Sequence, residues 1–245
     1  MRTSDGLILR GWFAPGNNGG TVIFTHGGGA NRMQFYPEAR ALHRHGFGFL
    51  LYDSRGSGES DGDLHTRGDR EQRDVEAAMD YVSSRADVDH NRIALVGFSI
   101  GASSVALAAV DDSRARAVVL CAIWTSLEDE MKTNVGKYGP LSWGPTLLAL
   151  RRYGVDIDNV RPIDRIAAIA PRPLLFVSGT RDGDTPLAIT ERVFAAAREP
   201  KDLWIVQDAG HGEYLAAAPT EYESRLVGFL DRALSIRDVP SAHEK

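Results

Sequence analysis

One serine of this 245-residue chain stands in a pattern that suits nucleophilic catalysis, Gly97-Phe98-Ser99-Ile100-Gly101. An apolar run, Ile93 to Val96, precedes the pattern, and a segment rich in alanine and serine follows it. A serine between a strand and a helix of this kind lies on a sharp, strained turn, and its hydroxyl projects from the carboxyl edge of the sheet. Glycine on either side leaves room for the neighbouring backbone. We therefore predict that Ser99 is a catalytic nucleophile.

A serine hydroxyl is a weak nucleophile until a base removes its proton. The predicted base is His211, which follows the last expected strand in a loop flanked by glycines. Such a base needs a carboxylate that orients its ring. Asp182 follows the apolar strand Leu174 to Ser178 and is the predicted acid, with Asp184 as the alternative. Ser99, Asp182 and His211 thus form a predicted catalytic triad.

The oxygen that becomes negative during acyl transfer needs hydrogen-bond donors, which together form an oxyanion hole. The N–H of Ile100, the residue after the nucleophile, is one predicted donor. The loop His26-Gly27-Gly28-Gly29 supplies the other, and we expect the Gly28 N–H in this role, with that of Gly29 as the alternative. We expect His26 to hold the loop by hydrogen bonds rather than to act as a base.

Strand-like and helix-like segments alternate along the chain, which favours an α/β fold with a mostly parallel sheet covered by helices on both faces. Strands are expected at residues 7–13, 21–25, 47–52, 92–98, 117–123, 174–178 and 203–206. Helices are expected at residues 36–45, 75–82, 100–109, 187–197 and 222–230. The turn-forming residues 17–20 are typical of a hairpin. A sheet of this kind gathers the loops that carry the triad at its carboxyl edge.

Residues 124–160 interrupt this alternation, because they contain no strand but many large apolar side chains. We interpret them as a short helical cap insertion in a single domain that spans residues 1–245. The insertion would leave an open apolar pocket for short or medium acyl chains. The residues predicted to contact substrate are Trp124, Tyr138, Trp143 and Leu147. The alternative is that these side chains pack the insertion onto the sheet.

The composition is typical of a soluble globular protein, with 43% hydrophobic and 25% charged residues and a net charge of −5. Lysine and arginine are scattered, so we expect no basic face for nucleic acid or anionic lipid. No apolar run approaches the roughly 20 residues of a membrane span, and the first residues lack the apolar core of a signal peptide, which together predict a cytoplasmic protein. The single cysteine, Cys121, excludes an internal disulfide and a cysteine-rich zinc site, and no metal is expected. The loop Asp53 to Ser60 lacks the lysine of a P-loop, so we interpret it as structural, with Arg55 pairing locally.

Two segments carry a resemblance to a known family. Asp53 to Ser60 follows the pattern D-x-R-G-x-G-x-S, and Gly179 to Pro186 follows G-x-x-D-x-x-x-P. Together with the triad, they make the chain resemble the α/β-hydrolase superfamily, and within it the serine esterases and serine-aminopeptidase-like (BEM46-like) hydrolases. The resemblance implies an eight-stranded sheet and no cofactor, and it supports Asp182 as the acid. The three glycines after His26 resemble those of hormone-sensitive-lipase-like esterases, but those proteins carry alanine where this chain has Ile100.

The predicted activity is that of a carboxylesterase-type serine hydrolase, which cleaves a small-molecule carboxylic ester through an acyl-enzyme intermediate. A peptidase, amidase or thioesterase would use the same triad. Glu128, Asp129 and Glu130 are candidates for holding the amine of a peptide substrate. A non-catalytic binding protein of the same fold is the third hypothesis. No oligomeric state is predicted.

Overall fold

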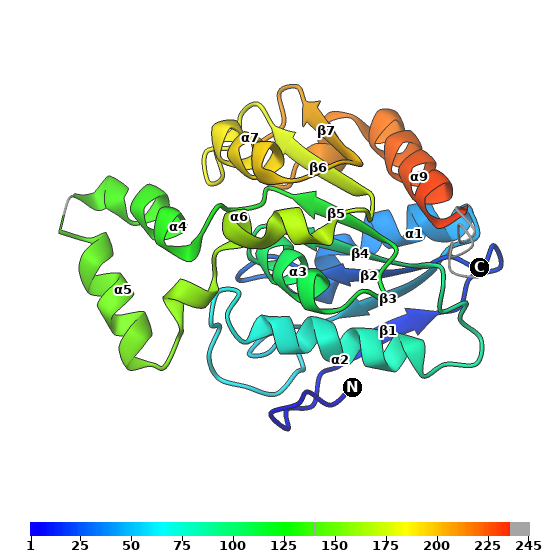
Figure 1. Cartoon of the computed structure of the whole chain (residues 1–245), viewed down its shortest axis with the longest axis horizontal. Helices are drawn as coiled ribbons and strands as arrows, with labels where there is room; N and C mark the ends of the chain where they lie inside the picture. The colour runs from blue at the N-terminus through cyan, green and yellow to red at the C-terminus, as the bar shows by residue number, and fades with distance from the viewer. Residues whose placement is uncertain (140, 236–245) are drawn as a thin grey trace, which may run out of the picture.

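Short apolar segments pair side by side in a single sheet at the centre of the molecule (Figure 1). The computed structural model describes residues 1–139 and 141–235. The strands are β1 (Gly11–Ala14), β2 (Thr21–Thr25), β3 (Gly48–Tyr52), β4 (Ile93–Phe98), β5 (Ala117–Cys121), β6 (Leu174–Gly179) and β7 (Lys201–Val206). Within the described residues they form one seven-stranded sheet in the order β1-β3-β2-β4-β5-β6-β7. β1 is antiparallel to β3, and every other pair is parallel.

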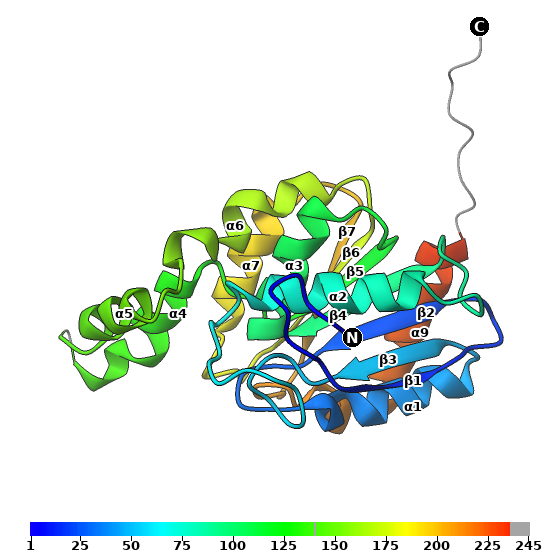
Figure 2. The same cartoon turned by 90° about the horizontal axis from the view of Figure 1, so that it is seen from below.

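Helices connect the strands and cover both faces of the sheet (Figure 2). The α-helices are α1 (Tyr36–Arg44), α2 (Glu71–Ser83), α3 (Ile100–Asp111), α4 (Leu127–Asn134), α5 (Trp143–Arg152), α6 (Pro162–Arg165), α7 (Leu187–Ala196), α8 (Tyr214–Ala217) and α9 (Pro219–Ser235). Short 3₁₀ turns are η1 (Arg32–Phe35), η2 (Gly136–Tyr138), η3 (Ile157–Asn159) and η4 (Ile166–Ile169). Apolar residues of α2, α3 and α7 pack on one face of the sheet, and those of α1 and α9 pack on the other.

The central strands β2, β4, β5 and β6 are buried at every residue, as expected for parallel strands with helices on both sides. The predicted α/β fold is therefore confirmed, and each expected strand and helix lies within a few residues of its predicted position. The pairing of β1 differs from expectation. β1 pairs with β3 instead of β2, so residues 17–20 do not form a hairpin.

The described sheet also has one strand fewer than the eight that the resemblance implies. At the N-terminus, Gly6 has a φ of 94° and turns the chain back on itself, so that Arg2 forms an isolated bridge with Ile8. The carbonyl of Ile8 then accepts a hydrogen bond from the N–H of Asp61, in a loop, over 3.0 Å. This segment is thus paired with itself and with a loop rather than with the edge of the sheet.

Residues 124–160 form the helices α4 and α5 with the turns η2 and η3, as expected, and they project from the body of the molecule (Figures 1 and 2). We call this segment the insertion. A buried apolar cluster joins it to α3; its members are Leu107, Leu127, Met131, Leu147, Val155, Ile157 and Val160. Among the described helices, none is long and apolar enough to cross a membrane. That the chain is one domain with a cap at 124–160 stays a prediction.

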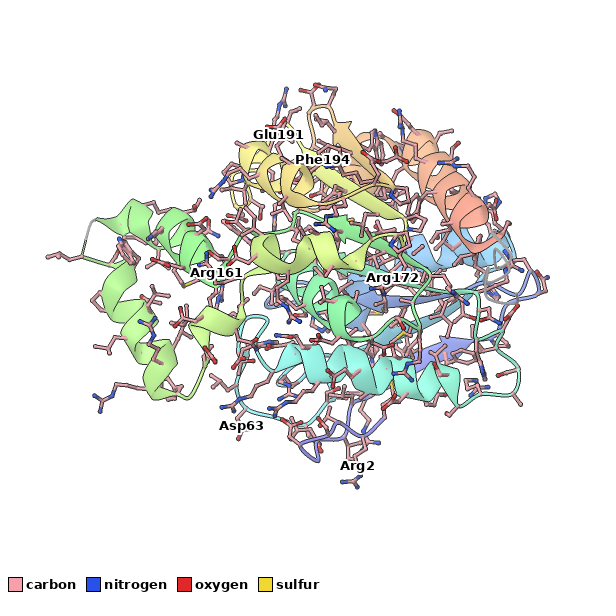
Figure 3. All side chains as sticks on the ribbon, viewed as in Figure 1. Arg2, Asp63, Arg161, Arg172, Glu191 and Phe194 are labelled. Carbon is pink, nitrogen blue, oxygen red and sulfur yellow. The ribbon has the colours of Figure 1, made fainter. Side chains whose placement is uncertain are left out.

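Two arginines tie loops to helices. Arg55, in the loop after β3, donates to Asp74 of α2 over 2.7 Å and to Asp5 of the N-terminal segment over 2.8 Å. Its partners lie 19 and 50 residues away, so its pairing is less local than predicted. Arg172, before β6, donates to the carbonyl oxygen of Asp112 over 2.9 Å and so satisfies an acceptor at the end of α3 (Figure 3).

Glu38, in the first turn of α1, is the described carboxyl group whose burial has the clearest consequence for stability. Its Oε2 atom is buried and has no hydrogen-bond partner among the described residues. Burial raises the pKa of Glu38 to about 7. The charge of Glu38 also contributes to the raised pKa values of Cys121 and Tyr222, for which burial is the largest cause.

We expect the Glu38 carboxyl group to lower the free energy of unfolding as the pH rises. Between the ordinary glutamate pKa of 4.5 and about 7, the unfolded chain releases this proton while the folded chain keeps it, so the free energy of unfolding falls across that window. Glu38→Gln removes the effect and should raise the free energy of unfolding above pH 7 by about 1–3 kcal/mol relative to wild type. Urea unfolding at several pH values measures it. Glu191→Gln, an exposed change on α7, is the control, and equal pH slopes for all three proteins would contradict the expectation.

Candidate active site

Ser99 lies between β4 and α3 in a backbone conformation that side chains rarely adopt, with φ 55° and ψ −119°. Its N–H donates to the carbonyl of Cys121 over 2.8 Å, which fixes the turn to the end of β5. A Cβ atom on Gly97 would lie 2.5 Å from the carbonyl oxygen of Gly101, and one on Gly101 would lie 2.4 Å from that of Thr25. The turn therefore closes only with glycine at both positions.

His211 and Asp182 meet in the loops that follow β7 and β6. The Nδ1–H of His211 donates to Oδ2 of Asp182 over 2.8 Å. Oδ1 of Asp182 accepts from the backbone N–H groups of Asp184, at 3.0 Å, and Thr185, at 2.7 Å. The Asp182 side chain is fully buried, and that of His211 is 22% exposed. The carboxylate is thus held by three donors, and Nε2 of His211 is left to receive a proton.

This geometry distinguishes between the two candidate acids. Asp182 contacts His211, whereas Asp184 is exposed and contributes only its backbone N–H to Asp182. The side chain of Asp184 therefore has no part in the pair. The geometry favours Asp182 as the orienting acid.

Two contacts with Phe98 place His211 at the end of β4, one through the His211 ring and one through Gly212. The ring of Phe98, the residue before Ser99, lies 4.5 Å from the ring of His211 between centroids. A Cβ on Gly212 would lie 3.0 Å from the Phe98 ring, so the loop of His211 sits directly on it. In the part of the chain that the structure describes, the Ser99 hydroxyl makes no hydrogen bond. Catalytic hydrogen bonds often tighten only when substrate binds.

The glycine loop also lies beside Ser99. A Cβ on Gly27 would be 3.4 Å from Cβ of Ser99, and one on Gly28 would be 2.5 Å from the side chain of Ile100. The N–H of Gly27 donates to Gln34 Oε1 over 2.8 Å. No described residue accepts a hydrogen bond from the N–H of Gly28 or of Ile100. These two donors beside Ser99 are therefore available to a substrate oxygen.

His26 holds the glycine loop in place. Its Nδ1–H donates to the carbonyl of Gly27 over 2.8 Å, and its Nε2 accepts from the N–H of Ser54 over 3.0 Å. Burial lowers the pKa of His26, which agrees with a neutral ring that donates at one nitrogen and accepts at the other. Both nitrogens are occupied, so His26 is a structural residue of the loop rather than a base.

The four side chains predicted to contact substrate have different surroundings. Leu147 is buried in the cluster that joins the insertion to α3, and Trp143 packs against that cluster. Tyr138 is 78% exposed, with Lys137 over its ring. Trp124 is buried at the start of the insertion. Leu147 and Trp143 therefore pack the insertion against α3, which favours the packing alternative for these two residues.

Sequence reasoning missed an ion pair in which the carboxylate is buried. Arg67, with a backbone φ of 56°, pairs through Nη2 with Oε1 of Glu130 on α4. Burial raises the pKa of Glu130, against the opposing effect of the charges of Arg67 and His211. The signal in the sequence was the acidic run 128–130, but it did not show which member faces inward. Glu128 pairs with Lys132 at 2.7 Å on the outside of α4.

Comparisons with known proteins agree with this architecture. A family model described as alpha/beta hydrolase fold matches residues 20–146, which is more than half of the chain. The chain belongs to the α/β-hydrolase fold family. A second model, described as TAP-like protein, matches residues 139–232 of this hydrolase.

Individual relatives cover nearly the whole chain. The uncharacterized protein YfhR of Salmonella typhi is 31% identical over 252 residues, which are 95% of this chain and 80% of that protein. The polyketide transferase grgF of Penicillium sp. is 25% identical over 279 residues and covers 95% of each chain. The structure of the Pyrococcus furiosus esterase PF2001 has a TM-score of 0.79 at 23% identity and covers 95% of this chain and 89% of that chain. At 23% identity, the likeness to the esterase structure shows a shared fold alone.

No group of three or more histidine, cysteine or carboxylate side chains within the described residues is arranged to hold a metal ion.

Asp182→Asn should remove the acceptor that orients His211, because an amide can present its N–H₂ to Nδ1 and favour the wrong tautomer. We expect kcat to fall by about 10³–10⁴-fold with little change in KM. The matched control is Asp184→Asn, which keeps the backbone N–H that Asp182 accepts and should stay within about threefold of wild type. Steady-state kinetics on a p-nitrophenyl ester measures both. Similar losses in the two variants would contradict the assignment.

Glu130→Gln tests the ion pair with Arg67. The amide carries no charge, so Arg67 loses its ionic partner and the free energy of unfolding should fall by about 1–3 kcal/mol in urea unfolding. The control is Glu128→Gln, two residues away on the same helix and paired with Lys132 on the outer side of α4, which should change the free energy of unfolding by less than about 1 kcal/mol. An unchanged free energy of unfolding in Glu130→Gln, or equal losses in the two variants, would contradict a stabilising role of this ion pair.

Proposed function

We propose that this α/β hydrolase is a serine esterase that cleaves small carboxylic esters of short to medium acyl chains through an acyl-enzyme. The observation that carries the proposal is the 2.8 Å contact between His211 and Asp182 against Phe98, directly beside the strained Ser99 turn. A strained serine, an oriented imidazole and unpaired backbone donors in one place are what acyl transfer requires.

In the first half-reaction, Ser99 Oγ attacks the ester carbonyl carbon while Nε2 of His211 takes the hydroxyl proton. The carbonyl oxygen becomes negative and accepts hydrogen bonds from the N–H groups of Gly28 and Ile100, at the N-terminus of α3, where the helix dipole also favours negative charge. The tetrahedral intermediate then collapses. The bond to the leaving alcohol breaks, His211 donates its proton to that alcohol, and the acyl group remains on Ser99.

In the second half-reaction, His211 removes a proton from water and the resulting hydroxide attacks the acyl carbon. The bond from the acyl carbon to Ser99 Oγ breaks, and His211 returns the proton to Ser99. The carboxylic acid leaves. Asp182 keeps its hydrogen bond to Nδ1 throughout and stabilises the imidazolium form.

The likeness to an esterase structure and to a polyketide transferase supports acyl chemistry of this kind. The patterns at 53–60 and 179–186 support a place among the serine-aminopeptidase-like, BEM46-like members of the family. For a peptide substrate, however, the acids that would hold its amine are already engaged, because Glu128 pairs with Lys132, Asp129 with Arg192 and Glu130 with Arg67.

Ser99→Ala should lower kcat on p-nitrophenyl butyrate by about 10⁴–10⁶-fold, since no other group in the mechanism forms the acyl-enzyme. Ser84→Ala, at the end of α2 on the far side of the fold, is the matched control and should keep wild-type activity. A fluorophosphonate probe should label wild type and Ser84→Ala but not Ser99→Ala. Full activity or full labelling of Ser99→Ala would overturn the mechanism.

Substrate choice is measured with p-nitrophenyl esters of increasing acyl length and with an aminoacyl p-nitroanilide. The proposal expects turnover of short and medium esters and little turnover of the anilide. Faster cleavage of the anilide than of the esters would make the protein a peptidase with the same triad. If the probe labelled Ser99 but the protein hydrolysed none of these substrates, the acyl acceptor would be a molecule other than water.

A further inference from the structure

The insertion carries an unusual concentration of exposed apolar side chains. Seven large apolar side chains are exposed among the described residues, and four of them lie in the insertion. These four are Tyr138, Leu141, Leu148 and Tyr153, with exposed fractions of 78%, 84%, 59% and 68%. Isolated exposed apolar residues are common on soluble proteins, but a local group of them marks a contact surface.

Helix α5 is apolar on both of its sides. On its inner side, Leu147 is buried in the cluster that joins the insertion to α3. On its outer side, exposed apolar residues follow one another at helical spacing from just before the helix; they are Leu141, Pro145, Leu148 and Ala149. We call these four residues, with Tyr138 and Tyr153 at the two ends, the α5 outer face. A helix that only met water on this side would carry polar residues there.

The charge around the α5 outer face is positive. Residues 131–155 contain Lys132, Lys137, Arg151 and Arg152 and no aspartate or glutamate, although the whole chain has a net charge of −5. Lys132 pairs with Glu128 at 2.7 Å, and Arg151 lies 3.7 Å from Asp158. Lys137 and Arg152 have no ion pair within the described residues. These four cations are spread over 21 positions of the sequence.

These features specify the kind of partner. Tyrosine combines an apolar ring with a polar tip, and lysine and arginine carry a charge on an apolar stem, which suits the boundary between lipid headgroups and acyl chains. A second copy of the chain fits less well. A two-fold contact brings the same surface of both copies together and would place these four cations against their own counterparts.

We propose that the α5 outer face, with Lys137 and Arg152 at its two ends, docks on an anionic phospholipid surface. The helix would lie in the plane of the headgroups with its apolar residues inserted among them. The insertion follows β5 at the carboxyl edge of the sheet and stands outermost on that side of the molecule (Figures 1 and 2). Docking would therefore turn the edge that carries Ser99 toward the lipid. This inference goes beyond the proposed function and does not depend on it.

Co-sedimentation of the full chain with vesicles tests the proposal directly and requires no activity. The vesicles are phosphatidylcholine alone, or phosphatidylcholine with about one third phosphatidylglycerol. We expect binding to the mixed vesicles, weak binding to pure phosphatidylcholine, and a loss of binding as sodium chloride screens the charges. Equal binding to the two vesicle types, or none to either at low salt, would overturn the proposal.

Variants assign the binding to the α5 outer face. Lys137→Glu with Arg152→Glu should weaken binding to the mixed vesicles by at least about tenfold. The matched control reverses the same number of charges on the body, at the exposed Arg10 and Arg198, and should bind like wild type. If the two double variants lost vesicle binding equally, the assignment would be overturned, because only the total charge of the protein would then matter.

Leu148→Ser tests the apolar part separately. Leu148 is already exposed, so the change should leave thermal unfolding unaltered while it weakens vesicle binding by about tenfold. Sedimentation velocity without lipid tests whether this face instead joins two copies of the chain. A dimer that Leu148→Ser dissociates, together with no vesicle binding by wild type, would make this face an interface between copies and would contradict the lipid proposal.

Discussion

The left-handed backbone of Ser99 is the constraint on which the rest of the site depends. A residue with φ near 55° and a helix starting directly after it can follow a strand only where the adjacent backbone comes very close. Gly97 and Gly101 permit that approach, within 2.4–2.5 Å of the positions that Cβ atoms would need. The turn is then anchored by the bond from Ser99 N–H to Cys121. The strain is thus maintained by the sheet and not by the turn itself.

The same sheet explains how Asp182 and His211 meet across 29 residues of sequence. β6 and β7 are parallel and end at one level, with Gly179 opposite Val206. The two loops that leave them cross at once, because a Cβ on Gly179 would lie 2.2 Å from the carbonyl oxygen of Ala209. The N–H of Arg181 binds that same carbonyl over 2.9 Å. The register of β6 and β7 therefore brings Asp182 and His211 to the same end of the sheet, and Gly179 lets their loops cross.

Local patterns predicted what depends on neighbours in sequence. The apolar runs marked the strands, and the glycines around Ser99 and the position of Asp182 after β6 indicated the triad. Pairing across long distances was not predictable in this way, since nothing near residues 17–20 shows that β1 joins β3. The pair between Arg67 and Glu130 was missed for the same reason, because its members are 63 residues apart and only the fold decides which acid of α4 is buried.

The predicted catalytic residues and the insertion are held by different kinds of contact. Ser99, Asp182 and His211 are fixed by backbone geometry and hydrogen bonds in the body. The insertion adds one apolar cluster and several polar links to that body, such as Arg70 to the carbonyl of Gly154 at 2.8 Å and Arg192 to Asp129 at 3.3 Å. Its outer face takes no part in these contacts. A substitution on that face therefore leaves unchanged the contacts that hold Ser99, Asp182 and His211.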